Sequence, residues 1–193
     1  MPQQSTFLEE LMAAGRGVIG LLVGDRKAGG AFDFSYRGLA GSFIALLVVT
    51  ALNAVLPVML GQRDPGGIGR TVIIVAILFV LQLAFSAIVL RQLKRLDGLV
   101  PYLVADNWAT FFVSLIAAAI SAAGINGDPV TIVFVIVGII IQVNIARLIV
   151  TLAPLQIAMF IVAQLVGVLI GLVLIGMVFP LPPELAAQLG AAS

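Results

Sequence analysis

Residues 130–179 decide the fold of this protein, and they read VTIVFVIVGIIIQVNIARLIVTLAPLQIAMFIVAQLVGVLIGLVLIGMVF. This stretch of fifty residues carries one formal charge, Arg147. One bilayer crossing takes about 20 apolar residues, so the stretch is too long for a single span. It is also too apolar for the core of a soluble domain. We therefore predict a tight hairpin of two membrane-spanning helices joined near residues 151–154, with Arg147 just before the turn.

The composition of the whole chain points to the same class of protein. Of its 193 residues, 62% are hydrophobic and 10% are charged, whereas a soluble domain has roughly 25% charged residues. The net charge of +1 provides no basic surface for nucleic acid. Cysteine and histidine are both absent, which excludes disulfides, thiolate chemistry, the usual zinc sites and histidine-based triads. We expect no enzyme activity, no cofactor, no metal site and no nucleic-acid partner.

The pattern along the chain predicts an all-α polytopic membrane protein with three parts. Residues 1–38 form a cytoplasmic amphipathic and juxtamembrane segment, residues 39–179 form a five-helix transmembrane domain, and residues 180–193 form a short extracytoplasmic tail. Loops rich in Gly, Pro or charge separate the apolar runs. The five spans are predicted over residues 39–60, 71–90, 102–124, 130–150 and 155–179.

An additional helix is predicted ahead of the spans, from Thr6 to Val23. Its apolar residues recur at intervals of three and four, which is typical of one helix face. Thr6 and Glu9 have the spacing of a capping box, which marks a helix start. The helix either lies in the membrane interface or docks on the bundle or on a partner protein.

The cations predict the orientation of the chain in the cell inner (plasma) membrane. Lys and Arg collect in cytoplasmic loops. With five spans, eight of the ten cations fall on the side of the amino terminus, and Arg63 and Arg70 fall on the other side. The amino terminus is therefore expected in the cytoplasm and the carboxyl terminus outside it. The eight cations are Arg16, Arg26, Lys27, Arg37, Arg91, Lys94, Arg95 and Arg147.

A polar cluster is predicted near the inner ends of the third and fourth spans. Asp106 and Arg147 are expected on the same side of the membrane at similar depth, with Asn107 and Asn144 nearby. They either form an ion pair between the two spans or remain two separately solvated interfacial charges. An arginine placed close to a helix end can extend its side chain to the headgroups.

Four amides lie deeper within the predicted spans: Asn53, Gln82, Gln142 and Gln164. They either line a polar path or form hydrogen bonds between helices. The fourth span has polar or small residues on two faces, which predicts that it is the central helix. In the fifth span, Gly167 and Gly171 have the Gly-x-x-x-Gly spacing that allows close helix packing. They pack inside the bundle or form a homo-oligomer contact.

The layout of the chain resembles the Yip1-domain family. Residues 32–39 lead into the first span, and residues 101–108 (PYLVADNW) open the third span with a proline and aromatic entry. The resemblance implies a cytoplasmic amino-terminal segment, five closely spaced spans and a carboxyl end just past the fifth. The Asp-Leu-Tyr-Gly-Pro-like motif of the eukaryotic members has no counterpart here, so the resemblance implies no GTPase-linked trafficking role.

Two functions from different classes agree with these features. The first is a non-catalytic scaffold or accessory protein that organises the membrane and presents residues 1–38 and 91–101 to partners at the cytoplasmic face. The second is a small oligomeric transporter or channel with an amide-lined interior. In both cases the lipid bilayer surrounds most of the chain.

Overall fold

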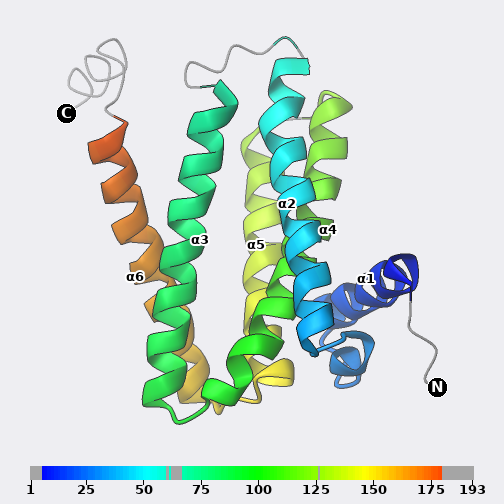
Figure 1. Ribbon diagram of the computed structural model, residues 1–193, viewed down its shortest axis with the longest axis vertical. Coiled ribbons are helices and arrows are strands. Elements are labelled where there is room, and N and C mark those ends of the chain that lie inside the picture. Colours follow the sequence, from blue (N-terminus) through cyan, green and yellow to red (C-terminus); the bar gives the residue numbers. More distant parts are fainter. Residues whose placement is uncertain (1–5, 60, 62–66, 126, 180–193) are drawn as a thin grey trace.

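The computed structural model describes residues 6–59, 61, 67–125 and 127–179, and this part of the chain folds into helices with no β-strand (Figure 1). Five helices are long and apolar enough to cross a membrane. They contain α2 (Tyr36–Met59), α3 (Gly67–Gln92), α4 (Leu99–Ala122), α5 (Asp128–Asn144) and α6 (Pro154–Val178). The third span also includes the 3₁₀ turn η2 (Leu96–Gly98), and the fourth continues from α5 to Ile149. The predictions of an all-α chain and of five helices long and apolar enough to span a membrane are confirmed for the described residues. The predicted tail, residues 180–193, lies outside the described residues.

The remaining long helix, α1 (Phe7–Val23), lies across the end of the bundle at which α4 begins (Figure 1). It begins with the predicted capping box. Thr6 Oγ1 accepts a hydrogen bond from Glu9 N at 3.3 Å, and Glu9 Oε2 accepts one from Thr6 N at 2.7 Å. Gly24 ends the helix in the left-handed conformation, with φ 74°, which glycine adopts at little cost. A short 3₁₀ turn, η1 (Ala28–Ala31), follows.

The spanning helices form two units. Helix α3 packs along α6, and α2 packs along α4 with α5 and α1 beside them (Figure 1). The close α3–α6 contact depends on small residues, because a Cβ atom at Gly171 would lie 2.7 Å from Leu78 Cδ2 and one at Gly167 would lie 3.0 Å from Phe85 Cδ2. Both glycines thus face a neighbour inside the bundle.

Helix α4 is the central helix, and the prediction that the fourth span, α5, takes this place is wrong. In the most apolar window of each span, 44% of residues are buried for α4 and 17% for α5. The reason is aromatic bulk near the start of α4, where the Tyr102 and Trp108 side chains are almost completely buried. Because large side chains provide most of the packing contacts, the other helices gather around this part of α4.

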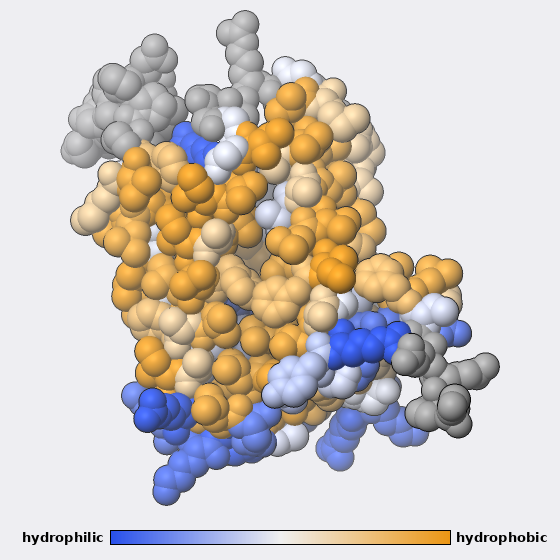
Figure 2. All heavy atoms as spheres, viewed as in Figure 1, coloured by the Kyte–Doolittle hydropathy of each residue, from blue (hydrophilic) through white to orange (hydrophobic). Residues whose placement is uncertain are grey.

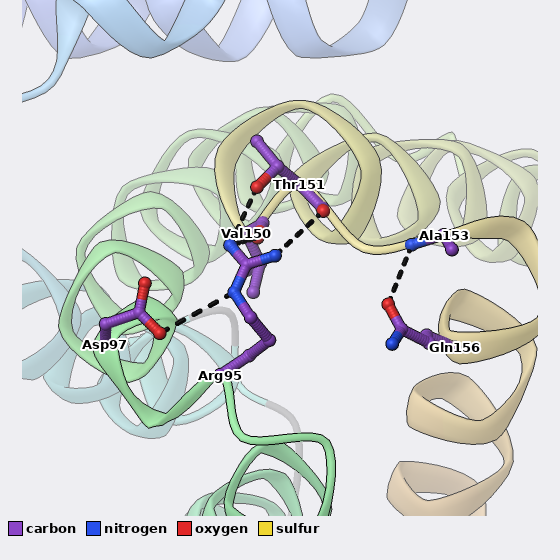
Figure 3. A network of polar contacts seen from close by, with 6 residues as sticks. All are labelled: Arg95, Asp97, Val150, Thr151, Ala153 and Gln156. Carbon is purple, nitrogen blue, oxygen red and sulfur yellow. Dashed lines mark hydrogen bonds and ion pairs between the residues drawn. The ribbon is translucent and has the colours of Figure 1, made fainter.

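The connection between α5 and α6 begins with a π-helical turn, η3 (Ile145–Ile149). Thr151 then adopts a left-handed conformation with φ 58°, which is costly for a residue with a branched Cβ. Arg95 holds this turn from the loop after α3 (Figure 3). It donates to Val150 O at 2.5 Å, Thr151 O at 3.1 Å and Thr151 Oγ1 at 2.7 Å. This set of hydrogen bonds, the Arg95 clamp, thus pairs the carbonyl groups of Val150 and Thr151, which the end of a helix leaves without partners.

Apolar side chains cover a broad band of the surface, and hydrophilic ones collect below it, at the end that contains α1 and the connection between α3 and α4 (Figure 1 and Figure 2). We call this end of the bundle, which carries Arg91, Lys94 and Arg95, the charged end.

Candidate intramembrane polar site

Asp106 is a carboxyl group buried between three helices. It lies seven residues into α4, about 10 Å along the helix, and its residue is 6% exposed. Its Oδ2 accepts a hydrogen bond from Gln82 Nε2 of α3 at 3.3 Å, and its Oδ1 accepts one from Gln142 Nε2 of α5. Two amides from neighbouring helices therefore hold the carboxyl group.

Tyr102 extends this network to α6. It precedes Asp106 by one helical turn, so both side chains lie on the same side of α4. Its Oη accepts hydrogen bonds from Gln82 Nε2 at 2.8 Å and Gln164 Nε2 at 2.9 Å. Gln164 also donates to Ser86 Oγ of α3 at 3.2 Å. The network therefore crosses the boundary between the α3–α6 unit and α4.

The amides in this network face Asp106 and Tyr102 with their NH₂ groups. A carboxylate can only accept hydrogen bonds, so Gln82 and Gln142 must present nitrogen to Asp106 and turn their carbonyl oxygens away. The Oε1 atom of Gln142 is buried and has no hydrogen-bond partner. Buried polar atoms are nearly always paired. This oxygen can therefore accept a hydrogen bond from a donor that the described residues do not supply.

Two cavities meet at this network. One, of about 270 Å³, lies between α3, α5 and α6 and has Gln82, Gln142 and Gln164 in its wall. The other, of about 160 Å³, lies between α4 and α5. Gly138 and Gln142 border both cavities. A Cβ atom at Gly138 would meet nothing within 4 Å, so the missing side chain leaves open space beside the network. The smaller cavity is lined by Asp106, Ala109, Thr110, Val113, Ser114, Gly138, Ile141 and Gln142.

The predicted pair between Asp106 and Arg147 does not form. Arg147 is exposed, and the partners of Asp106 are the amides of Gln82 and Gln142. The residue of α5 that reaches Asp106 is Gln142. Arg147 follows it by five residues and lies beyond the end of α5, in the π-helical turn η3. The alternative, a solvated Asp106, does not describe this site either, because the side chain is buried.

The other members of the predicted polar cluster make separate contacts. Asn107 Nδ2 donates to Ser42 Oγ of α2 at 3.1 Å. Asn144 Nδ2 donates to Leu21 O at 2.8 Å, near the end of α1. Asn107 thus joins α4 to α2, and Asn144 joins α5 to α1.

Three of the four predicted interior amides come together: Gln82, Gln142 and Gln164. The fourth, Asn53, is exposed on α2 and is not part of this network. Four further residues belong to the network or line its smaller cavity but were not predicted as site residues: Tyr102, Ser86, Thr110 and Ser114. One signal was present, because Gln82–Ser86 and Tyr102–Asp106 are each four residues apart and therefore share a helix face.

Comparison of the chain with protein-family models, with curated proteins and with solved structures gave no match. The described residues also contain no group of three or more Asp and Glu side chains placed to hold a metal ion. The function is therefore inferred from the geometry of the site itself.

Proposed function

We propose that the protein is a small, non-catalytic transporter whose amide-lined interior binds a cation at Asp106. The observation that carries this proposal is a buried carboxyl group held by Gln82 and Gln142, with no Lys or Arg of the described chain in ion-pair distance. This carboxyl group also borders a cavity.

Asp106 brings a negative charge into the helix bundle when its carboxyl group is ionised. An ionised aspartate inside a bilayer is costly, up to about 2.5–3.5 kcal/mol at the centre on insertion scales. Removing this cost takes a proton or a cation beside the carboxylate. Since no side chain of the described residues supplies the positive charge, we infer that a mobile ion supplies it. Ionisable residues inside membranes mark ion and proton pathways in transport proteins.

The division into two helix units supports the same function. Gln82 and Gln164 belong to the α3–α6 unit, whereas Tyr102 and Asp106 belong to α4. Alternating access in transporters commonly uses the movement of one helix unit against another around a fixed site. Hydrogen bonds between side chains, which can break and re-form, join the two units here.

Charge movement in proteoliposomes would test this function. We expect concentration jumps of sodium, potassium or alkylammonium salts to produce currents on a solid-supported membrane with at least one of these cations. Asp106→Asn should abolish the currents, and Gln142→Leu and Gln164→Leu should reduce them. Asp97→Asn is the matched control, because Asp97 is exposed in the loop after α3. Absence of current with every cation, or an unchanged current in Asp106→Asn, would overturn the proposal.

A second candidate function, an accessory protein that resembles the Yip1-domain family, is favoured by the surface of α1. One face of this helix is buried and includes Ala14, Val18 and Leu21. The face that carries Glu9 and Arg16 is exposed. Between them lies an exposed apolar face, with side chains of Leu8, Met12, Ile19 and Leu22. Such a helix can contact the bundle, the bilayer and the cytoplasm at once.

Photo-cross-linking in native membranes would test the accessory function. A photoreactive residue at Arg16 should yield a discrete protein adduct, whereas one at Ile19 should label lipid. Equal lipid labelling from both positions would count against a protein partner at this face.

Both candidate functions place the protein in the inner (plasma) membrane with its amino terminus in the cytoplasm. The charged end of the bundle supports this orientation, because Arg91 lies there in the last turn of α3 and Lys94 and Arg95 lie in the loop that follows. Positive residues are enriched in cytoplasmic loops.

A further inference from the structure

We propose that the cation bound at Asp106 is a small alkylammonium ion, with its ammonium group in the small cavity beside Asp106 and Gln142 and its hydrocarbon part in the larger cavity beyond Gly138. This inference names the substrate class of the proposed transporter and therefore rests on that function. Binding and transport are separate measurements, however, so each part can fail without the other.

The polar part of the site offers acceptors. Asp106 accepts from two amides and keeps further lone pairs free, since a carboxylate has about four. Gln142 Oε1 is buried and has no partner. Thr110 and Ser114, which carry hydroxyl groups, line the same small cavity. An ammonium group supplies several N–H donors and one positive charge, which matches this set of acceptors.

The walls of the larger cavity favour an organic cation over a hydrated inorganic one. Beyond the three amides they are formed by Val135, Gly138, Ile139, Ile161, Leu165 and Val168. A hydrated sodium ion would keep water against these apolar side chains, whereas an alkyl chain gains about 0.8 kcal/mol for each CH₂ group that it buries. The volume of about 270 Å³ is at the small end of the range for ligand pockets. These dimensions point to a short alkyl chain.

In this binding mode the ligand passes from the small cavity to the larger one beside Gly138. Gly138 borders both cavities, and a side chain added there would occupy open space and not another residue. A larger residue at this position should therefore obstruct the ligand while leaving the packing of α5 intact. Gly176 of α6 is a matched control, because a Cβ atom there also meets nothing within 4 Å and Gly176 borders neither cavity.

Equilibrium binding to the full-length protein in nanodiscs, with n-butylammonium chloride as the probe, tests the inference. We expect saturable binding that weakens at least tenfold in Asp106→Asn and in Gly138→Val, while Gly176→Val binds as the wild type does. The uncharged n-butanol at the same concentration should not displace the probe. Thermal unfolding and gel filtration establish that each variant is folded.

Three results would overturn the alkylammonium assignment: no saturable binding, equal binding in Asp106→Asn and wild type, or displacement by sodium at the same concentration as by butylammonium. If sodium currents depend on Asp106 but butylammonium does not bind, the substrate class is wrong and the transport function stands. If butylammonium binds as expected but no cation produces a current, the site stands and the transport function fails.

Discussion

Gln164 Nε2 lies 2.9 Å from Tyr102 Oη, and this hydrogen bond joins α6 to α4, two helices from different units of the bundle. Tyr102 accepts from Gln82 at the same oxygen. One phenol therefore pairs two amides that would otherwise need other partners inside the bilayer.

Tyr102→Phe should destabilise the protein by about 1 kcal/mol, because hydrogen bonds between transmembrane helices contribute roughly 0.6–2 kcal/mol. Unfolding in mixed micelles of increasing SDS content measures the change. Tyr36→Phe is the control, since Tyr36 is 86% exposed at the start of α2. Equal stability of the two variants would show that the Tyr102 hydroxyl group contributes nothing to the association of the helix units.

Arg95→Met should destabilise the α5–α6 hairpin by about 1.5–3 kcal/mol, the range for hydrogen bonds made by a charged group. The substitution keeps an unbranched side chain but removes the donors to Val150 and Thr151. Hydrogen exchange at residues 145–153 should become faster. Arg91→Met, at an exposed position in the last turn of α3, should leave exchange unchanged. The clamp has no stabilising role if exchange rises equally in both.

Gly171→Leu should separate α3 from α6. The new side chain would meet Leu78, whose Cδ2 atom lies 2.7 Å from the site of a Cβ atom, and overpacking of this kind typically costs about 1–3 kcal/mol. Gly176→Leu places the same side chain in open space on the same helix. The measurement is the SDS content at half unfolding, which should fall for Gly171→Leu alone. A fall of the same size in both variants would indicate a general loss of α6 stability.

Glu10 should make the docking of α1 dependent on pH. Burial raises the pKa of the Glu10 carboxyl group, Asp33 raises the pKa further, and Arg37 lowers it. Because the pKa is higher in the docked state than in water, docking takes up a proton. Its stability is greatest at acidic pH and is lost as pH rises through the raised pKa.

The single tryptophan of the chain, Trp108, can report this change, since its ring lies 6.1 Å from that of Phe7 in α1. Acrylamide quenching of its fluorescence should increase as pH rises above the ordinary pKa of glutamate. The increase should be absent in Glu10→Gln and present in Asp97→Asn, whose carboxyl group is exposed. Identical pH curves for wild type and Glu10→Gln would refute the role of Glu10.

The orientation can be tested with single-cysteine variants, because the chain contains no cysteine of its own. A cysteine placed at Arg26 or Lys94 should react with a membrane-impermeant maleimide only in inverted vesicles. One at Asp128, at the start of α5, should react in intact spheroplasts. Labelling of all three positions from one side would contradict the crossing pattern.

The sequence by itself was enough to predict the number of spans, the hairpin at residues 151–154 and the capped start of α1. These features depend on local quantities, namely the length of apolar runs, the positions of Pro and Gly, and the spacing of Thr6 and Glu9. The same quantities predicted that Gln82, Gln142 and Gln164 belong to helix interiors, because amides within long apolar runs need partners.

The tertiary structure alone decided which polar groups meet. Asp106 pairs with Gln142 and Gln82 and not with Arg147, and α4 replaces α5 as the central helix. Both outcomes depend on how each helix is rotated about its axis and shifted along it. A shift of one residue turns a helical side chain by about 100°, so hydropathy can locate a polar residue in depth without indicating its neighbour. In this bundle the rotation of α5 is what places an amide, and not the arginine, beside the buried carboxyl group.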